Sequence, residues 1–498
     1  MASDSRPGVS GMSVYVPPLR VPLQAWCDWT NNSWDKIQAV VGRSFRYPAP
    51  HENVYTMAAN AVLRLIRDYD VDPASVGFLA LGTESSKDNS AGAVIVRGMV
   101  DRALEQLGMP RLARSCEVPE FKHACLGGVY ALKGALRYLS YDGAGRRAIV
   151  VCGDVAEYER GSTGEQTQGA GAVAMLVEDV PRLFAVDLER SGSASDYRGP
   201  DFRKPFARHF VDGYAQKVNR LHDFPVFSGK YSTFSYLDET GQAVDSMLKR
   251  LGVSGRKFVS DVKGMFFHRP YHLMPVQALA FLYVRALAGS RTGGPELKAL
   301  CDEVGVPVER VIEESRSSPD LFGSLLAQNG SNGQTGGPPE PYPITAQVAA
   351  HVRKASAFKE LIKSKMSLGS DRAMELGNLY TAALPAWMAA GFEEALETGL
   401  ELEGETLLAV GYGSGDAAEA IPLRAVPRWQ DAACRIGFTE ALKGAVDLTR
   451  EQYEALHDGR AIPGLDEAPR RGFVISRVGE THEPAFQDLG VEYYEYVQ

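Results

Sequence analysis

Cys125 lies where a polar stretch of the chain gives way to an apolar pattern of helical period, so we expect it to head a helix. A thiol in that place faces unpaired backbone N–H groups and the positive end of the helix dipole, which favour the nucleophilic thiolate. Gly127 and Gly128 follow and allow close approach of other backbone. Because a free cysteine is more often a small core residue than a nucleophile, this position alone leaves both interpretations open.

Three other polar side chains follow apolar runs that are typical of buried strands. Glu84 comes after residues 76–81, His268 after residues 262–267, and Ser414 after residues 407–410. Such runs, alternating with helical patterns, predict an α/β fold with parallel strands. Because ligands of open α/β sheets bind beyond the carboxyl ends of the strands, we expect these three side chains to meet Cys125 in one crevice.

The composition is that of a globular protein, with 45% hydrophobic residues, 23% charged residues and a mean hydropathy of −0.18. A net charge of −9 argues against nucleic acid or a membrane surface as the main partner. The sequence has neither an apolar run of about 18 residues nor a signal-peptide pattern at its start. Six cysteines without paired spacing predict a reducing compartment, the cytoplasm, and neither a zinc site nor a disulfide framework.

The order of these patterns divides the chain into two halves. We expect residues 1–190 to form a half with Glu84 and Cys125, and residues 191–498 to form a half with His268 and Asn378. Two segments of the second half have the composition of inserted loops, residues 200–227 and residues 329–343, and the second is rich in Gly, Asn and Pro.

Six short motifs follow one another along the chain, at residues 82–86, 124–128, 164–175, 267–271, 377–382 and 411–415. In wording and order they resemble the motifs of the 3-hydroxy-3-methylglutaryl-CoA synthase family, in its bacterial branch. This family belongs to the thiolase-like condensing enzymes. The resemblance reaches from about residue 10 to the C-terminus, and it implies a five-layered αβαβα fold built from two similar halves.

The resemblance also implies roles for individual residues in a Claisen-type condensation. Cys125 is expected to carry an acetyl group, Glu84 to remove a proton from its methyl, and His268 to polarise the ketone of the acceptor. Substrate-binding roles are implied for Asn378, Thr167, Tyr158, Ser232 and Ser414. Acetyl-CoA and acetoacetyl-CoA are then the substrates, no cofactor is required, and the expected assembly is a homodimer.

Each of these residues also has a purely structural interpretation. Glu84 could cap a following helix, His268 could be a hydrogen-bonded core histidine, and Asn378 could close a turn. Gly169 and Gly171 could serve only to let strands pack closely. These interpretations do not explain why the motifs follow the order of one family.

Two departures from the family concern the substrate. Leu273 stands where the family commonly has a lysine that contacts coenzyme A, and Glu375 stands where a cation is usual. Three functions therefore stay open: condensation of acetyl-CoA with acetoacetyl-CoA, the same chemistry on an acyl carrier protein in polyketide β-branching, and a non-catalytic scaffold. Arg269, Arg203 and Lys204 are candidate replacement contacts for phosphate.

Overall fold

The computed structural model describes residues 6–203, 224–226, 228–289, 294–330, 338–465 and 471–498. Most of the predicted insertion at 200–227, with Lys204, lies outside these ranges, as do residues 331–337 of the second predicted loop. That second loop is shorter than expected, because helix α11 runs to Gly330 and α12 begins at Pro343. Pro343 suits the first turn of α12, where a backbone N–H has no partner within the helix.

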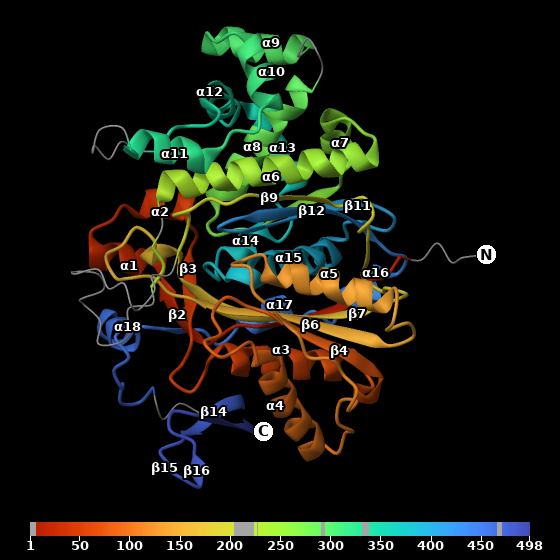
Figure 1. The fold of residues 1–498 in the computed structure, drawn as a ribbon, viewed down its shortest axis with the longest axis vertical. Helices are drawn as coiled ribbons and strands as arrows, with labels where there is room; N and C mark the ends of the chain where they lie inside the picture. Colours follow the sequence, from red (N-terminus) through yellow and green to blue (C-terminus); the bar gives the residue numbers. More distant parts are fainter. Residues whose placement is uncertain (1–5, 204–223, 227, 290–293, 331–337, 466–470) are drawn as a thin grey trace.

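Five layers stack along the long axis of the molecule (Figure 1): helices, a sheet, two central helices, a second sheet, and helices again. This order confirms the five-layered expectation. The central helices are α5 (Gly127–Leu139) and α15 (Ala383–Thr398), and both lie between the sheets. The nucleophile segment is therefore held in the middle of the protein, between its two halves.

The sheet of the first half is covered on its outer side by α3 (Val54–Asp68) and α4 (Gly92–Gln106). Asn53 begins α3 by accepting hydrogen bonds from the N–H groups of Tyr55 and Thr56, which completes a capping box. The strands of this sheet are β1 (Gly8–Tyr15), β4 (Val76–Gly82), β5 (Glu120–Phe121), β6 (Arg147–Ala156) and β7 (Gly169–Glu178).

The sheet of the second half is covered on its outer side by α6 (Gly229–Leu251) and α8 (Leu273–Ala288). Its strands are β9 (Gly192–Ser195), β10 (Gly264–Phe267), β11 (Thr406–Gly413) and β12 (Ala417–Ala425), while β8 (Phe184–Val186) comes from the end of the predicted first half and lies between the two sheets. Beyond α8 lie further helices, α9 (Gly294–Val304), α10 (Val308–Arg316), α11 (Leu321–Gly330) and α12 (Pro343–Val352). Helix α7 (Gly255–Asp261) packs on α6 and α8, α13 (Ser356–Lys365) contacts β10, and α14 (Ser370–Ala373) packs on the central helix α15.

Short strand β8 pairs with β1 on one side and with β12 on the other, so the two sheets form one hydrogen-bonded path. The strand order is β10-β11-β12-β8-β1-β7-β6-β4-β5. Pairing is parallel at β4–β5, β4–β6 and β10–β11 and antiparallel elsewhere along this path. The expectation of parallel strands was therefore only partly right, because two buried antiparallel strands have the same continuous apolar pattern as parallel ones.

The remaining described elements lie at the side and base of this stack. A three-stranded sheet of β2 (Leu19–Pro22), β3 (Ser44–Tyr47) and β13 (Val446–Asp447) lies with α1 (Leu23–Thr30), α2 (Trp34–Val40) and α18 (Arg450–His457). Short helices α16 (Trp429–Ala433) and α17 (Phe438–Leu442) lie against α15. Hairpins β14 (Gly472–Val478), β15 (His482–Glu483), β16 (Phe486–Gln487) and β17 (Glu492–Val497) end the chain.

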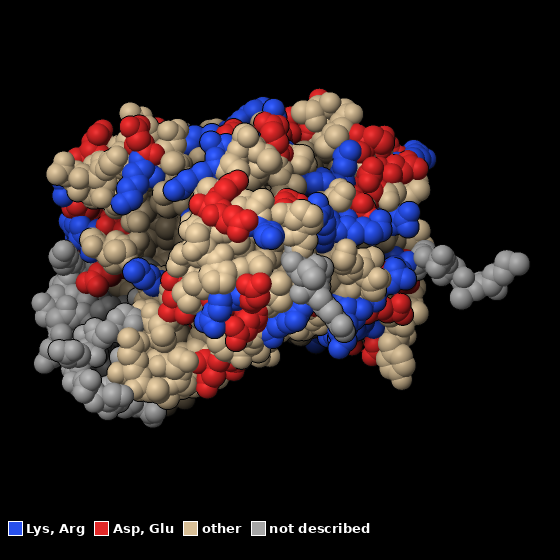
Figure 2. Space-filling model, turned by 90° about the horizontal axis from the view of Figure 1, so that it is seen from above, with Lys and Arg blue, Asp and Glu red and all other residues tan. Residues whose placement is uncertain are grey.

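Seen from the α6 side, Lys and Arg are interspersed with Asp and Glu over most of the face (Figure 2). The described residues on this face therefore carry charges of both signs. None of the helices within the described ranges has the length and apolar character needed to cross a membrane.

Candidate active site

Cys125 lies in the turn between β5 and α5, two residues before the helix begins at Gly127. The turn is closed by hydrogen bonds from the N–H of Leu126 to the carbonyl of His123 (2.9 Å) and from Gly127 to Ala124 (3.4 Å). Ala124 has φ of 42°, a left-handed conformation that a residue with a side chain adopts only when its surroundings impose it. The prediction that Cys125 stands at the start of a helix is confirmed.

Glycines from three elements hold this turn in place. A Cβ on Gly82, the last residue of β4, would lie 2.5 Å from the Cα of Gly128. One on Gly128 would lie 2.4 Å from Sγ of Cys152, and one on Gly413 would lie 2.5 Å from the carbonyl oxygen of His123. Larger residues cannot be accommodated at these contacts without moving the backbone that carries Cys125.

Glu84 follows β4 in a turn that the carboxylate of Asp154 organises. Oδ1 of Asp154 accepts hydrogen bonds from the N–H groups of Glu84 (2.8 Å) and Ser85 (3.0 Å) and from the Thr83 hydroxyl (2.9 Å). Its Oδ2 accepts the N–H of Thr381 at 2.9 Å, from the second half of the chain. Asp154 therefore links the Glu84 turn to the segment that follows Asn378.

Glu84 does not cap a helix, since the next helix, α4, begins only at Gly92 and has Ala91 at its N-cap. Instead, Oε2 of Glu84 lies 3.5 Å from Sγ of Cys125, within hydrogen-bonding reach for sulfur. Burial, together with the nearby carboxylates of Glu84 and Asp154, raises the pKa of the Cys125 thiol well above its ordinary value. The expectation of a stabilised thiolate was therefore wrong, because two carboxylates and burial outweigh the helix N-terminus.

His268 follows β10, and its backbone is fixed by a 2.7 Å hydrogen bond from its N–H to the carbonyl of Val410. Its ring is 2% exposed and stacks on Tyr412, with 6.4 Å between ring centroids. Nδ1 is buried and has no hydrogen-bond partner, so His268 is not the satisfied core histidine of the structural interpretation. Burial lowers the pKa of His268 to about 3, and the ring is therefore neutral at physiological pH.

Asn378 lies in a loop that packs on the glycine-rich strand β7. Its N–H bonds to the carbonyls of Thr167 and Gln168, both at 3.2 Å, and its Oδ1 accepts the N–H of Tyr380 at 2.9 Å. A Cβ on Gly169 would lie 2.5 Å from the carbonyl oxygen of Asn378. The turn-closing interpretation of Asn378 and the close-packing interpretation of Gly169 are thus both correct descriptions of the fold.

A cavity of about 260 Å³ brings the predicted residues together. Of the eight residues predicted for the site, seven line it: Cys125, Tyr158, Thr167, Ser232, His268, Asn378 and Ser414. Glu84 reaches it through its contact with Cys125. The cavity therefore combines a thiol, a carboxylate next to it, and a neutral imidazole with a free ring nitrogen, an arrangement suited to acyl transfer and to stabilising an oxyanion.

The residues in doubt for phosphate binding have other contacts. Glu375 is paired with Arg43, whose Nε lies 2.5 Å from Oε1, and accepts the Ser44 hydroxyl at 2.9 Å. Arg269 is buried, donates to Ser370 at 2.9 Å and lies over the ring of Trp387. These contacts remove Arg269 from the candidates for phosphate binding.

Arg203 donates to the carbonyl oxygens of Asp201 at 2.9 Å and Gly415 at 3.1 Å, so it too has a structural role. Lys204 lies outside the described residues. Leu273 begins α8, directly before cavity residue Met274.

Sequence reasoning missed two groups of residues around the site. Asp154 lies within β6, directly after the apolar run 148–152 and Gly153, and the pattern of a polar residue after an apolar run, which identified Glu84 and His268, could also have identified Asp154. Tyr412 lines the cavity from β11, and Arg198, Asp201 and Asp416 lie behind it. Nothing in the spacing of those three residues could have brought them together, since the contact depends on the fold.

Comparisons with known proteins point to one family. Residues 4–181 match the family model described as the N-terminal part of hydroxymethylglutaryl-coenzyme A synthase. The hydroxymethylglutaryl-CoA synthase of Haloferax volcanii is 27% identical over 413 residues, covering 83% of this chain and 82% of that protein. The enzyme of Saccharomyces cerevisiae is 24% identical over 462 residues, covering 90% and 81%.

Solved structures share the fold over the whole chain. MvaS in complex with 3-hydroxy-3-methylglutaryl coenzyme A superimposes with a TM-score of 0.73 at 23% identity, covering 99% of both chains. The HMG synthase of the curacin biosynthetic pathway, in complex with a holo donor acyl carrier protein, gives 0.68 at 19% identity, covering 99% of this chain and 100% of the other. The thiolase-like fold expected from the sequence is confirmed.

Proposed function

We propose that this chain, a member of the hydroxymethylglutaryl-CoA synthase family, condenses acetyl-CoA with acetoacetyl-CoA and water to give 3-hydroxy-3-methylglutaryl-CoA and CoA. The observation that carries the proposal is the 3.5 Å contact between Sγ of Cys125 and Oε2 of Glu84 at a cavity that His268 also lines. This product would feed the mevalonate route to isoprenoids.

In the first step the thiol of Cys125 attacks the thioester carbonyl of acetyl-CoA. Because its raised pKa keeps the thiol protonated at neutral pH, attack needs a base, and Glu84 lies within reach of the proton. Glu84 then returns this proton to the departing CoA sulfur. The enzyme is left as an acetyl thioester on Cys125 with Glu84 ionised again.

In the second step Glu84 removes a proton from the acetyl methyl, and the enolate carbon attacks the ketone of the acetoacetyl thioester. Negative charge moves to the ketone oxygen, where hydrogen-bond donors stabilise it and each can contribute about 3 kcal/mol. His268 suits this role as a neutral donor, since a ring with a pKa of about 3 stays uncharged, and Asn378 lies on the same cavity. Glu84 gives up the proton that it took, so the alkoxide becomes the 3-hydroxyl group, and water then hydrolyses the Cys125 thioester to a carboxylic acid and the free thiol. Protein side chains alone carry each step, so the scheme includes no cofactor.

A second candidate is the same chemistry on an acceptor delivered by an acyl carrier protein. The observation that favours it is Leu273 at the start of α8, where a CoA-contacting lysine is expected, together with the pairing of Glu375 to Arg43. The curacin pathway relative was solved with a donor carrier protein. A carrier protein would need a basic face to dock on, and the basic residues at 203–209 are the candidate for it; of these, only Arg203 lies within the described residues. A non-catalytic scaffold is disfavoured, because a scaffold has no need for this thiol, base and imidazole.

Intact-mass spectrometry after mixing with acetyl-CoA tests the proposal. We expect a mass gain of one acetyl group that disappears in Cys125→Ala and persists in Cys434→Ala, which removes the exposed cysteine. Acetoacetyl-CoA and acetoacetyl carrier protein are then compared as acceptors that discharge the acetyl-enzyme, and the faster one identifies the substrate. Absence of an adduct from both acetyl-CoA and acetylated carrier protein would exclude both enzyme functions.

We further propose a cytoplasmic homodimer. Strand β5 ends the order of the sheet, so within the described chain its outer edge is free to meet a second copy. Sedimentation equilibrium of the full chain should give twice the 54.1 kDa chain mass, and a monomeric mass at micromolar concentration would contradict the dimer.

A further inference from the structure

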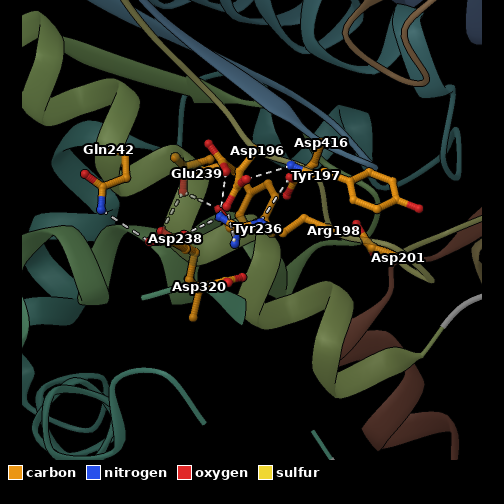
Figure 3. Close-up of polar contacts among 12 residues, drawn as sticks. Asp196, Tyr197, Arg198, Asp201, Tyr236, Asp238, Glu239, Gln242, Asp320 and Asp416 are labelled. Carbon is orange, nitrogen blue, oxygen red and sulfur yellow. Dashed lines mark hydrogen bonds and ion pairs between the residues drawn. The ribbon is translucent and has the colours of Figure 1, made fainter. Parts of the chain in front are cut away.

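A cluster of buried charges surrounds Arg198 (Figure 3), and Tyr412, which lines the active-site cavity, contacts it through Asp416. Arg198 is 2% exposed, and its guanidinium contacts three buried carboxylates: Asp238 at 2.5 Å, Glu239 at 2.6 Å and Asp416 at 3.2 Å. A fourth, Asp196, lies 3.0 Å away and is half exposed. One cation cannot neutralise three buried carboxylates, and an unpaired buried charge is costly, so part of this cluster must hold protons.

Tyr412 connects this cluster to the cavity. Its hydroxyl lies 3.2 Å from Oδ2 of Asp416 and 3.1 Å from Oδ2 of Asp201, and Asp201 also accepts the hydroxyl of Ser232 at 2.5 Å. The ring of Tyr412 is the surface on which His268 stacks, and Tyr412 and Ser232 both line the cavity. The position of the proposed acceptor-polarising residue thus depends on where this tyrosine is held.

The number of protons limits the directions that these hydrogen bonds can take. The Tyr412 hydroxyl has one proton and can donate to only one of the two carboxylates at a time. The Ser232 hydroxyl already donates to Asp201, whose Oδ2 is left to accept from Tyr412. The contact with Asp416 is then a hydrogen bond only if Asp416 itself carries a proton on Oδ2, while its Oδ1 accepts from Nε of Arg198.

We propose that Asp416 and Arg198 are positioning residues for the acceptor step. A protonated Asp416 donates a hydrogen bond to Tyr412, Tyr412 donates one to Asp201, and these two hydrogen bonds hold the Tyr412 ring on which His268 stacks. The inference rests on the proposed function, because the acceptor step is part of it. Loss of the Asp416 proton replaces a donor with a second acceptor and leaves the Tyr412 hydroxyl shared between two carboxylates.

The pH dependence follows from the groups around Asp416. Burial and the nearby carboxylates of Glu239 and Asp201 raise the pKa of Asp416 to about 9, against the opposing effect of Arg198. Burial also raises the pKa of Glu239 to about 7. The other ionisable groups of this cluster and its surroundings are Asp196, Asp238, Tyr231, Tyr412 and Arg203. Burial also raises the pKa of Asp201, the other carboxyl in contact with Tyr412, but the Ser232 hydroxyl and Arg203 oppose that rise. We therefore assign the proton at neutral pH to Asp416, and the hydrogen bonds through Tyr412 should fail on the alkaline side.

Three variants separate this role from a purely ionic one. Asp416→Asn keeps an acceptor for Arg198 and a donor for Tyr412 but cannot ionise. Asp416→Ala removes both. Asp196→Asn is the matched control, because Asp196 contacts Arg198 but not Tyr412.

The measurement is the rate at which acetoacetyl-CoA removes the acetyl group from Cys125, as a function of pH. The maximal rate and the acetoacetyl-CoA concentration that gives half of it are determined separately. We expect wild type to slow above about pH 9, Asp416→Asn to keep its neutral-pH rate within about threefold and lose the alkaline decline, and Asp416→Ala to be about tenfold to a hundredfold slower at neutral pH. The Asp196→Asn profile should match wild type. If Asp416→Asn is as slow as Asp416→Ala, Asp416 acts as an anion for Arg198 and the proposal is wrong.

A readout that needs no turnover separates this proposal from the proposed function. The infrared difference spectrum between wild type and Asp416→Asn at neutral pH should contain the carbonyl band of a protonated carboxylic acid. This holds even if acetyl-CoA never acylates Cys125. A carboxylate band in its place would overturn the proposal, whatever the enzyme acts on.

Discussion

Replacing Asp154 with Asn should loosen the turn that carries Glu84 and destabilise the protein. The Asp154 carboxylate is the acceptor in all six of its hydrogen bonds. The donors are N–H and hydroxyl groups of Thr83, Glu84, Ser85 and Thr381. An Asn side chain must place its NH₂ group at one of the two oxygen positions, where it faces donors. The carboxamide therefore cannot reproduce the contacts that the carboxylate makes.

The expected loss can be worked out from the contacts. With the NH₂ group at the Oδ2 position, the buried N–H of Thr381 loses its acceptor, which costs about 1–3 kcal/mol. At Oδ1, the N–H groups of Glu84 and Ser85 exchange a charged acceptor for a neutral one, which costs roughly 1 kcal/mol each. Burial raises the pKa of Asp154 and so favours a neutral side chain, but it supplies no acceptor for these donors. We expect a net loss of about 3 kcal/mol, a large part of the stability of a typical domain.

Urea denaturation of wild type and Asp154→Asn measures this loss. Asp101→Asn is the matched control, since Asp101 is also buried and accepts a backbone N–H, from Leu112 at 2.9 Å, but lies away from the cavity. Both variants should be less stable, and only Asp154→Asn should also acetylate Cys125 more slowly per folded molecule. A free energy of unfolding within about 1 kcal/mol of wild type for Asp154→Asn would refute the reasoning.

Other predictions follow from the same geometry. Glu84→Gln should slow both acetylation of Cys125 and condensation by about a hundredfold or more in single-turnover assays, because one base serves both steps, and normal acetylation would remove Glu84 from the first step. His268 has a folded pKa of about 3, below its unfolded value of about 6.5, so folded protein binds fewer protons than unfolded protein between these pH values. Its contribution to stability is therefore present above about pH 6.5 and lost as pH falls toward 3, and His268→Asn should flatten this part of the pH–melting curve. Gly128→Ala should lower the melting temperature through its 2.4 Å clash with a buried sulfur, while Gly98→Ala, in open space on helix α4, should raise it slightly; equal shifts would contradict the close-packing argument.

The sequence was sufficient to predict where the candidate catalytic side chains lie, but not which of them are ionised. Buried strands that end in polar turns correctly placed Glu84 and His268, and a helical pattern placed Cys125, because each signal is local in the chain. The protonation state of Cys125 was predicted wrongly because it depends on Glu84 and Asp154, which lie 41 and 29 positions away in the chain.

The residues behind the cavity could not be predicted for the same reason. Arg198 and Asp416 are 218 positions apart, and only the pairing of β9 with β12 brings their segments together. The mixture of parallel and antiparallel pairing could not be predicted either. Strands β6 and β7 are buried and apolar, and a buried strand has such a sequence in either kind of pairing. The roles of the eight predicted site residues stay predictions until the variants are made.

The short strand β8 limits how substrates can enter. Because it pairs with β1 and with β12, and because α5 and α15 lie between both sheets, the two sheets are joined by continuous hydrogen bonds, and we do not expect them to swing apart about a hinge. We therefore expect entry to the cavity and release of product to need local movement of residues that line it, such as Phe202, Gly229 and Tyr271. A pair of labels, one on each sheet, should report a constant distance between the sheets through the catalytic cycle. Labels on these lining residues should report opening of the cavity.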